Sequence, residues 1–357
     1  MADLRRWCRR LLRAWVRRRA PLGERVGTRV LANPHLRPVL NIAYERVWPL
    51  FATVVTRFFA TSSISVPFIW RARLRSGVLL VPVVPEEQRS WSNALLWRWP
   101  PNLPMRRFYE EYVDYKRRSV PGMRNLLLDV GANDGMHSCL FALAGWCCVA
   151  FEPQTSCIAQ VKRISDLNQF DDIRAEQCVV GDQAATDIDF YVSPSTWFSS
   201  LDQTSVERFE PAHAIRVDMI TLDSYCSERN VSPTCVKIDV EGGELLVLRG
   251  ARGLLETTNP DLVIEVSADT EIRTAVWNLL VPFGYHVYIL SGSRGRILRS
   301  VPSMGAFVTA NPGAAHVDAV FTADLALRAE LETVLSPRPS QSWLGAAAAR
   351  TLSRQSK

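Results

Sequence analysis

Residues 126–135, LLLDVGANDG, constrain the fold of this 357-residue chain more than any other stretch. Four apolar positions interrupted only by Asp129 predict a buried parallel strand. A glycine-punctuated turn follows, and Met136 can open a helix. In such a strand–loop–helix unit, backbone N–H groups and the positive end of the helix dipole point into one crevice at the carboxyl end of the strand. This stretch therefore predicts a site for a nucleoside-bearing ligand.

From residue 125 onward, strand-like and helix-like segments alternate. This alternation predicts an α/β fold with a doubly wound, mostly parallel sheet. A polar, β-like insertion at 186–218 separates the third strand from the fourth. The predicted strands cover 125–130, 146–151, 173–180, 234–239, 261–266, 284–290 and 316–321, and the predicted helices cover 136–145, 155–168, 221–229, 244–255 and 269–282.

Two elements are predicted ahead of this alternating pattern. Residues 77–84 are β-rich and contain Pro82, which suits an edge strand, and residues 105–118 predict a helix. We divide the chain into a basic N-terminal extension with an amphipathic helix (1–60), a lead-in segment of edge strands and a helix (61–120), an α/β domain (121–325), and a C-terminal helix with a flexible tail (326–357).

The charge is concentrated in the N-terminal extension. Residues 1–60 hold 13 Arg and three acids, a net charge of +10, against +6 for the whole chain, so residues 61–357 have a net charge of −4. Because nucleic-acid binding needs a basic face, the negative body predicts no nucleic-acid partner.

Residues 1–20 predict a basic amphipathic helix. Leu4, Trp7, Leu11 and Trp15 share one side and arginines occupy the other, which favours adhesion to an anionic membrane surface. The alternative is a helix packed on the body or on a partner. A mitochondrial transit peptide would usually contain serine, and this stretch has none.

The apolar segment 47–70 is split by Arg57 and carries two prolines. Its charge-free pieces are shorter than the roughly 18–20 residues that span a bilayer, so we predict no transmembrane helix; a membrane-associated hairpin is the alternative. The eight cysteines form no CxxC pair, and no His spacing completes a zinc site, so no metal site is predicted. With no signal peptide, we expect a cytoplasmic protein, peripheral at the membrane.

The glycine spacing discriminates between two cofactors. A dinucleotide site requires GxGxxG, whereas this loop has Asp129, Gly131, Asn133 and Gly135 at alternate positions. Asp129 would be unfavourable beside a pyrophosphate but suits a ligand with a positive amino group. S-adenosylmethionine has such a group, together with a sulfonium.

Two further acids follow the next predicted strands. Glu152 lies 23 residues after Asp129 and can accept both ribose hydroxyls, and Asp182 could reach the adenine amino group. Each acid also has a structural alternative: Asp129 could cap the following helix, Glu152 could pair with an arginine, and Asp182 could belong to an ordinary turn. Together the three acids favour the cofactor interpretation.

A second acidic cluster lies in VKIDVEGGE, residues 236–244. Asp239 and Glu241 follow a buried strand and would face the same crevice as the cofactor. Glu244, near a helix N-terminus, is explained by the helix dipole.

The motifs LLLDVGANDG, VAFEP, VVGD, ITLDSYC, VKIDVEGGELLVLRGA, DLVIEV and FGYHVYIL resemble, in order and approximate spacing, the FkbM family of methyltransferases. The resemblance covers roughly residues 75–325. It implies a Rossmann-like class I methyltransferase fold for the domain 121–325, with a seven-stranded sheet whose last strand is antiparallel. It also implies S-adenosylmethionine as methyl donor, and O-methylation of a hydroxyl on a sugar, glycolipid or secondary metabolite.

The resemblance also assigns roles to residues. Asp129, Gly131, Asn133 and Gly135 would line the methionine end, Glu152 would hold the ribose, and Asp182 would lie near the adenine. Asp239 and Glu241 match the family's KIDVEG signature, and their roles are a hypothesis from the chemistry of methyl transfer: Asp239 is the first candidate for the base or the residue that orients the acceptor hydroxyl, and Glu241 is the second. His137 is the third candidate, and its alternative is a satisfied residue at the start of the helix. Independently of the resemblance, Trp197 and Phe198 in the insertion could close over a small-molecule or glycan acceptor; the alternative is that they form local core.

Two other functions stay open. A nicotinamide-dependent sugar-modifying oxidoreductase is disfavoured by the missing GxGxxG. A catalytically inactive protein that binds membrane surfaces is disfavoured by the presence of Asp129, Glu152 and Asp239.

Overall fold

The computed structural model of the protein describes residue 33 and residues 68–83, 103–193, 199–207, 211–293, 296–311 and 315–334. The predicted helix of residues 1–20, most of the apolar segment 47–70, the pair Trp197 and Phe198, and the tail after residue 334 lie outside these residues. Among the helices that are described, none has the length and apolar character needed to cross a bilayer.

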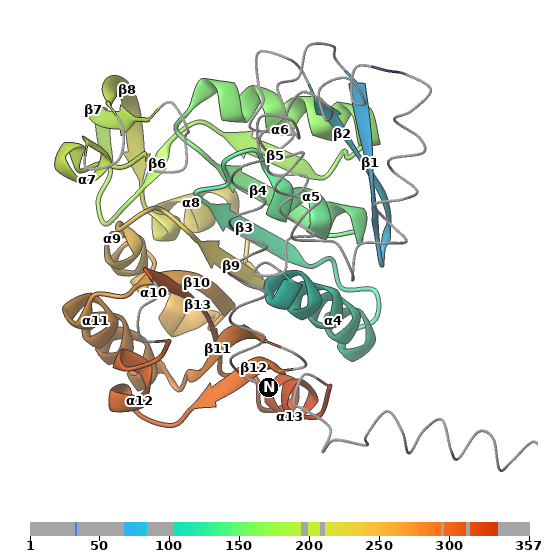
Figure 1. Cartoon of the computed structure of the whole chain (residues 1–357), viewed down its shortest axis with the longest axis vertical. Coiled ribbons are helices and arrows are strands. Elements are labelled where there is room, and N and C mark those ends of the chain that lie inside the picture. The colour runs from blue at the N-terminus through green and yellow to red at the C-terminus, as the bar shows by residue number, and fades with distance from the viewer. Residues whose placement is uncertain are drawn as a thin grey trace, which may run out of the picture.

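An eight-stranded sheet runs through the molecule in the order β12-β11-β13-β10-β9-β3-β4-β5 (Figure 1). Strands β5, β4, β3, β9 and β10 pair in parallel, and β13 is antiparallel to both of its neighbours. The predicted Rossmann-like α/β class, with an antiparallel last strand, is confirmed. The strands are β3 (Leu126–Val130), β4 (Cys147–Phe151), β5 (Ile173–Glu176), β9 (Cys235–Ile238), β10 (Asp261–Ser267), β11 (His286–Ser293), β12 (Arg296–Val301) and β13 (His316–Thr322).

All seven predicted strands contribute to this sheet, and β12 adds an eighth that the sequence pattern did not predict. The predicted strand 173–180 divides into β5 and β6 (Val179–Val180), and β6 joins a separate three-stranded sheet of order β6-β8-β7. That small sheet is the predicted β-like insertion, with β7 (Ala185–Val192), α7 (Gln203–Glu207) and β8 (His213–Ile220).

The predicted helix 244–255 is two helices, α9 (Glu244–Arg249) and α10 (Arg252–Thr257). The break has a local cause. The carbonyl of Gly250 accepts a hydrogen bond from the Asp223 N–H at 2.9 Å, so it is diverted from the helix. The Asp223 carboxylate then accepts the N–H groups of Gly253 and Leu254, both at 2.8 Å, at the start of the new helix.

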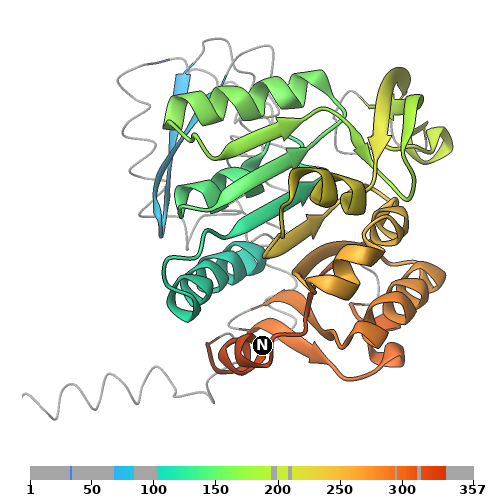
Figure 2. The ribbon, with the colours of Figure 1, turned by 180° about the vertical axis from the view of Figure 1, so that it is seen from behind.

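Helices cover both faces of the sheet and enclose two hydrophobic cores (Figures 1 and 2). The side chains of β3 alternate between them: Leu127 packs in the first core and Leu128 in the second. Helices with residues in the first core are α4 (Leu103–Ser119), α5 (Met136–Leu143), α6 (Thr155–Asn168) and α13 (Leu325–Val334). Those with residues in the second are α8 (Leu222–Arg229), α9, α10, α11 (Thr270–Leu280) with its 3-10 extension η3 (Val281–Phe283), and α12 (Met304–Val308).

The edge strand predicted at 77–84 is β2 (Gly77–Val83), paired in a hairpin with β1 (Phe68–Leu74). The side chain of Asn168 bonds both backbone groups of Leu80, at 2.8 and 2.7 Å, and Gln160 donates to the carbonyl of Pro82 at 3.0 Å. Amide side chains of α6 thus satisfy the outer edge of β2, where another strand would otherwise bond.

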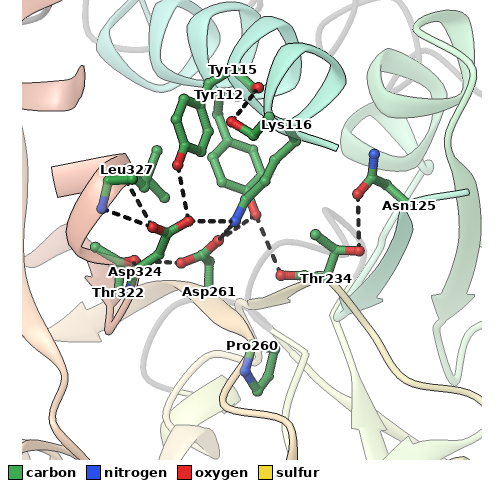
Figure 3. A network of polar contacts seen from close by, with 12 residues as sticks. Tyr112, Tyr115, Lys116, Asn125, Thr234, Pro260, Asp261, Thr322, Asp324 and Leu327 are labelled. Atoms are coloured by element: carbon green, nitrogen blue, oxygen red, sulfur yellow. Dashed lines mark hydrogen bonds and ion pairs between the residues drawn. The ribbon is translucent and has the colours of Figure 1, made fainter. Parts of the chain in front are cut away.

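A buried polar network ties α4 to the sheet (Figure 3). Asp261, the first residue of β10, accepts hydrogen bonds from the Tyr112 hydroxyl and the Thr322 hydroxyl, and pairs with the Lys116 ammonium at 2.8 Å. Lys116 also reaches Asp324 at 3.2 Å. Because Tyr112 and Lys116 of α4 contact residues more than 140 positions away, we propose that α4 folds as part of the domain 121–325.

Candidate active site

Two backbone segments meet at the carboxyl ends of β3 and β9. Gly131, Asn133 and Gly135 adopt left-handed conformations, with φ of 75°, 49° and 72°. A Cβ on Gly131 would lie 1.8 Å from the carbonyl oxygen of Asp239, so only glycine fits there. The loop predicted to bind the cofactor therefore touches the segment predicted to carry catalysis.

Asp129 is completely buried beneath this loop. Its Oδ2 accepts the N–H and the hydroxyl of Ser138, at 3.0 and 2.7 Å, in the first turn of α5. Its Oδ1 is buried and has no hydrogen-bond partner within the part of the chain that is described. Burial raises the pKa of Asp129, although Lys237 on the neighbouring strand opposes the rise. One oxygen thus caps the helix, and the other remains available to a donor.

Glu152, directly after β4, is buried and fastens the loop to its neighbour. Its two oxygens accept the backbone N–H groups of Asn133 at 2.9 Å and Gln154 at 3.0 Å. Burial raises the pKa of Glu152 to about 7. A carboxylate has about four acceptor positions, so two remain for hydroxyl groups.

These features fit S-adenosylmethionine. The partnerless Oδ1 of Asp129 suits an amino group, and Glu152 at the next strand end suits two ribose hydroxyls. The left-handed loop between them leads directly into α5, whose N-terminal end carries the positive end of the helix dipole.

Asp182 is placed differently from the other two acids. It is exposed and follows β6, which belongs to the small sheet and not to the central one. The carbonyl of Gly181 packs so closely on Gly250 that a Cβ on Gly250 would lie 1.9 Å from it. The proposed contact of Asp182 with adenine stays a prediction.

Lys237 and Asp239 form an ion pair at the end of β9. Nζ of Lys237 lies 2.9 Å from Oδ2 of Asp239, and the lysine is buried with 3% of its side chain exposed. Burial alone would raise the pKa of Asp239, but Lys237 holds it below its ordinary value. Burial alone would lower the pKa of Lys237, but the charges of Asp239 and Asp129 hold it above its ordinary value. Asp239 is therefore ionised but only weakly basic, so it suits orientation of a hydroxyl better than removal of its proton.

Glu241 and Glu244 differ in role: Glu241 lies at the surface, and Glu244 is buried and stabilises the backbone. Glu241 is exposed and has a left-handed backbone, with φ of 53°. Desolvation by surrounding atoms, together with the charge of Asp239, raises its pKa to about 7. Glu244 is buried and accepts the N–H of Gly242 at 3.0 Å, so it stabilises the loop at the start of α9.

The structure adds two groups that the motifs did not reveal. Glu265, near the carboxyl end of β10, hydrogen-bonds Nε2 of His316 at 3.0 Å, and His316 opens β13. Asp318 lies opposite Glu265 in the register of the two strands. An acid inside the apolar run DLVIEV was the available signal for Glu265, whereas His316 reaches the site only through the pairing of β10 with β13.

His137 also borders the site. Its Nδ1 lies 3.1 Å from the hydroxyl of Tyr109, and the two rings pack edge to face. Burial and the charge of Lys237 lower the pKa of His137, so its ring is neutral.

One carboxylate oxygen from each of Asp239, Glu241 and Glu265 lies within 4.8 Å of the other two. A single cation could be held at that spacing. However, Lys237 already pairs with Asp239, and His316 with Glu265. We therefore treat this group as a network of mixed charge and assign it no metal.

Comparison with known proteins relates part of the site, including Asp129, Glu152, Asp239 and Glu265, to a described domain. Residues 129–287 match the family model of the methyltransferase FkbM domain. No curated protein matches the chain. Among solved structures, the methyltransferase FkbM of Methylobacillus flagellatus KT is similar at 17% identity and a TM-score of 0.36, over 70% of this chain and 56% of that one, so the chain spans little more than half of that protein. A SAM-dependent methyltransferase of Agrobacterium tumefaciens is similar at 10% identity and a TM-score of 0.39, over 72% of this chain and 71% of that one.

Proposed function

We propose that the chain, whose residues 129–287 match the family model of the methyltransferase FkbM domain, transfers a methyl group from S-adenosylmethionine to a hydroxyl oxygen of a sugar, glycolipid or secondary metabolite. The observation that supports the proposal most is the contact between the Gly131 loop and Asp239. It brings a cofactor crevice on β3 and β4 beside a row of ionisable groups on β9, β10 and β13.

In this proposal Asp129 and Glu152 bind the cofactor, and Asp239 orients the acceptor. Asp129 holds the amino group of the cofactor through Oδ1, and Glu152 accepts the ribose hydroxyls. S-adenosylmethionine, when bound, supplies an electrophilic methyl group on a positively charged sulfur. Asp239, kept ionised by Lys237, accepts a hydrogen bond from the acceptor hydroxyl and orients its oxygen. Glu241 and the insertion 186–218 border the acceptor.

Incubation with S-adenosylmethionine labelled on its methyl group tests the activity. The acceptors are a panel of neutral methyl glycosides and a polar metabolite extract. We expect label in an ether that resists mild base. Label only in base-labile esters or in amines would contradict transfer to a hydroxyl. Asp239→Asn should lower turnover by about a hundredfold, within the usual range for a group that assists proton transfer or orientation, while S-adenosylhomocysteine affinity stays unchanged.

Calorimetry tests the cofactor residues separately. Charge-assisted hydrogen bonds contribute about 1.5–3 kcal/mol, so Glu152→Gln should weaken S-adenosylhomocysteine binding by about ten- to a hundredfold. Glu228→Gln, on the exposed surface of α8, is the matched control. Unchanged affinity in Glu152→Gln would contradict the ribose assignment. A melting temperature raised by NADH but not by S-adenosylhomocysteine would favour the oxidoreductase instead.

We also propose that the protein works in the cytoplasm at an anionic membrane surface, through residues 1–20. The arginine-rich composition of that stretch supports this location.

A further inference from the structure

Glu265 and His316 form a hydrogen-bonded pair beside Asp239. Their strands, β10 and β13, are antiparallel, and Ser267 lies opposite His316 in the register. Oε1 of Glu265 is 3.0 Å from Nε2 of His316. The Glu265 side chain is 20% exposed and that of His316 is 54% exposed, so a small molecule and water can reach the pair.

Charged groups face the pair from every neighbouring element. Lys237, Asp239 and Glu241 come from β9 and the loop after it, and Asp318 comes from β13. Glu244 at the start of α9 and His137 on α5 lie one step further away, where they interact with Asp239. Lys237 is engaged by Asp239 at 2.9 Å, and His137 is neutral. The remaining charge around Glu265 is therefore mainly negative, which favours a bound proton.

The direction of the pKa shifts agrees with this geometry. Burial and the charge of Asp239 raise the pKa of Glu265 to about 8. The hydrogen bond with Glu265 raises the pKa of His316 to about 9. The two groups titrate together, and near neutral pH the pair holds a proton more firmly than a free glutamate and histidine would.

We infer that Glu265 takes the proton of the acceptor hydroxyl, and that the positive charge of the bound methyl donor prepares it by expelling the proton that the Glu265–His316 pair holds in the free protein. This inference rests on the proposed function. It makes Glu265 a catalytic residue that the motifs did not reveal, and His316 the residue that positions it.

The acceptor oxygen forms a bond to the methyl carbon while the carbon–sulfur bond breaks, and the electron pair of that bond stays on sulfur. The hydroxyl proton passes to Glu265. The sulfur loses its positive charge in the same step, so the proton is again stable on the pair, from which His316 can pass it to water. Glu265 is therefore ionised while the cationic cofactor is bound, and it is protonated once the neutral product of the cofactor has formed.

Asp239 is less suited to this role. Its ion pair with Lys237 keeps its pKa low, so it accepts a proton poorly at neutral pH. Its negative charge instead raises the proton affinity of Glu265. The two acids thus differ in role because one has a buried lysine as partner and the other a half-exposed histidine.

Calorimetry of the full chain tests the inference without an acceptor. S-adenosylmethionine and S-adenosylhomocysteine are titrated near pH 7.5 in phosphate and in Tris, whose different ionisation enthalpies reveal the protons released on binding. We expect S-adenosylmethionine to release about half a proton more than S-adenosylhomocysteine. An analogue with an amine in place of the sulfonium methyl group should behave like S-adenosylmethionine.

Variants then locate the proton. In Glu265→Gln the difference between the two ligands should disappear while both still bind, and Glu228→Gln should keep it. In His316→Gln the pH of half-maximal release should rise, because the charge of His316 lowers the pKa of Glu265. Circular dichroism checks that each variant is folded.

Three outcomes would overturn the inference. Equal proton counts for the two ligands would exclude coupling to the sulfonium charge. A difference that persists in Glu265→Gln would place the proton on another group. Binding of neither ligand would overturn the proposed function as well, so failure of that proposal is distinguishable from failure of this one.

Discussion

At the scale of single residues, the site depends on one close approach between two loops. Gly131 combines a left-handed φ of 75° with a Cβ position 1.8 Å from the Asp239 carbonyl oxygen. Gly145 also has a left-handed φ, of 86°, but open space around its Cβ position. Alanine substitutions at Gly131 and Gly145 therefore separate the free-energy cost of a left-handed backbone from the cost of a steric clash.

We expect Gly145→Ala to lower the free energy of unfolding by about 1–2 kcal/mol, the cost of a left-handed alanine. Gly131→Ala adds overpacking, so the loss should reach about 2–5 kcal/mol, and S-adenosylhomocysteine should bind more weakly. Urea denaturation and calorimetry measure the two effects. Equal losses for the two variants would show that the contact with Asp239 is not constrained.

Glu152 gives a prediction on pH. Burial raises its pKa to about 7, whereas an unfolded chain has a value of about 4.3. Between these values the folded state binds a proton that the unfolded state lacks. The stability from this group is therefore fully present below the unfolded pKa and is lost as pH rises through about 7.

Urea denaturation of the ligand-free protein at pH 5 and pH 8 measures how the contribution of Glu152 to the free energy of unfolding changes with pH. Wild type should lose more stability between the two pH values than Glu152→Gln, because the amide does not titrate. Glu228→Gln should lose as much as wild type. If wild type and Glu152→Gln lose the same amount, Glu152 is not the titrating group.

The sequence revealed the residues that follow strands in local motifs, and missed those that depend on strand pairing. Asp129, Glu152 and Asp239 each stand directly at a strand end within a recognisable run. Glu265 and His316 are 51 positions apart and meet through the register of antiparallel strands, which no local pattern encodes. The ion pair between Lys237 and Asp239 was also missed. The sequence shows the two residues in the run KID, but it does not show that Lys237 is buried, and burial is what makes the pair shift the pKa of Asp239.

At the scale of elements, periodicity and breakers predicted the order of strands and helices but not where tertiary contacts interrupt them. The run 173–180 contains no breaker, yet it divides because β6 pairs with β8 in another sheet. The helix 244–255 divides because the Gly250 carbonyl is diverted to Asp223. β12 was missed because its sequence, RILRSV, alternates weakly and follows a glycine-containing turn.

The attachment of α4 to the sheet is also a property of elements. Lys116 neutralises Asp261, which is 4% exposed and also accepts the Tyr112 hydroxyl (Figure 3). Removal of one partner of a buried ion pair leaves an uncompensated charge, which costs about 3–5 kcal/mol. Exposed pairs contribute far less, about 0–1 kcal/mol.

Lys116→Met should therefore lower the free energy of unfolding by about 3–5 kcal/mol in urea denaturation. Arg117→Met, which removes an exposed pair with Asp114 on the same helix, should change it by less than about 1 kcal/mol. The double variant Lys116→Met/Asp261→Asn should recover part of the loss. A small loss in Lys116→Met would mean that the helix is held by its apolar contacts alone.

At the scale of the whole molecule, charge is separated along the chain. The first 60 residues have a net charge of +10 and the remainder −4. The crevice lies in the acidic part, where Asp239, Glu265 and Asp318 gather at three strand ends. We therefore expect the acceptor to be neutral rather than phosphorylated or carboxylated, and the basic extension to favour an anionic surface.

This separation predicts that membrane attachment and cofactor binding are independent. Vesicles with about one-third anionic lipid should sediment the full chain at low salt, and removal of residues 1–20 should abolish most of the binding, because each basic residue near such a surface contributes about 1 kcal/mol. Raising the salt should have the same effect through screening. S-adenosylhomocysteine affinity should stay unchanged in the truncated chain. If the truncated chain still binds more than about half as well, attachment lies elsewhere, and if neutral vesicles sediment the full chain equally, the arginines are not what the membrane attracts.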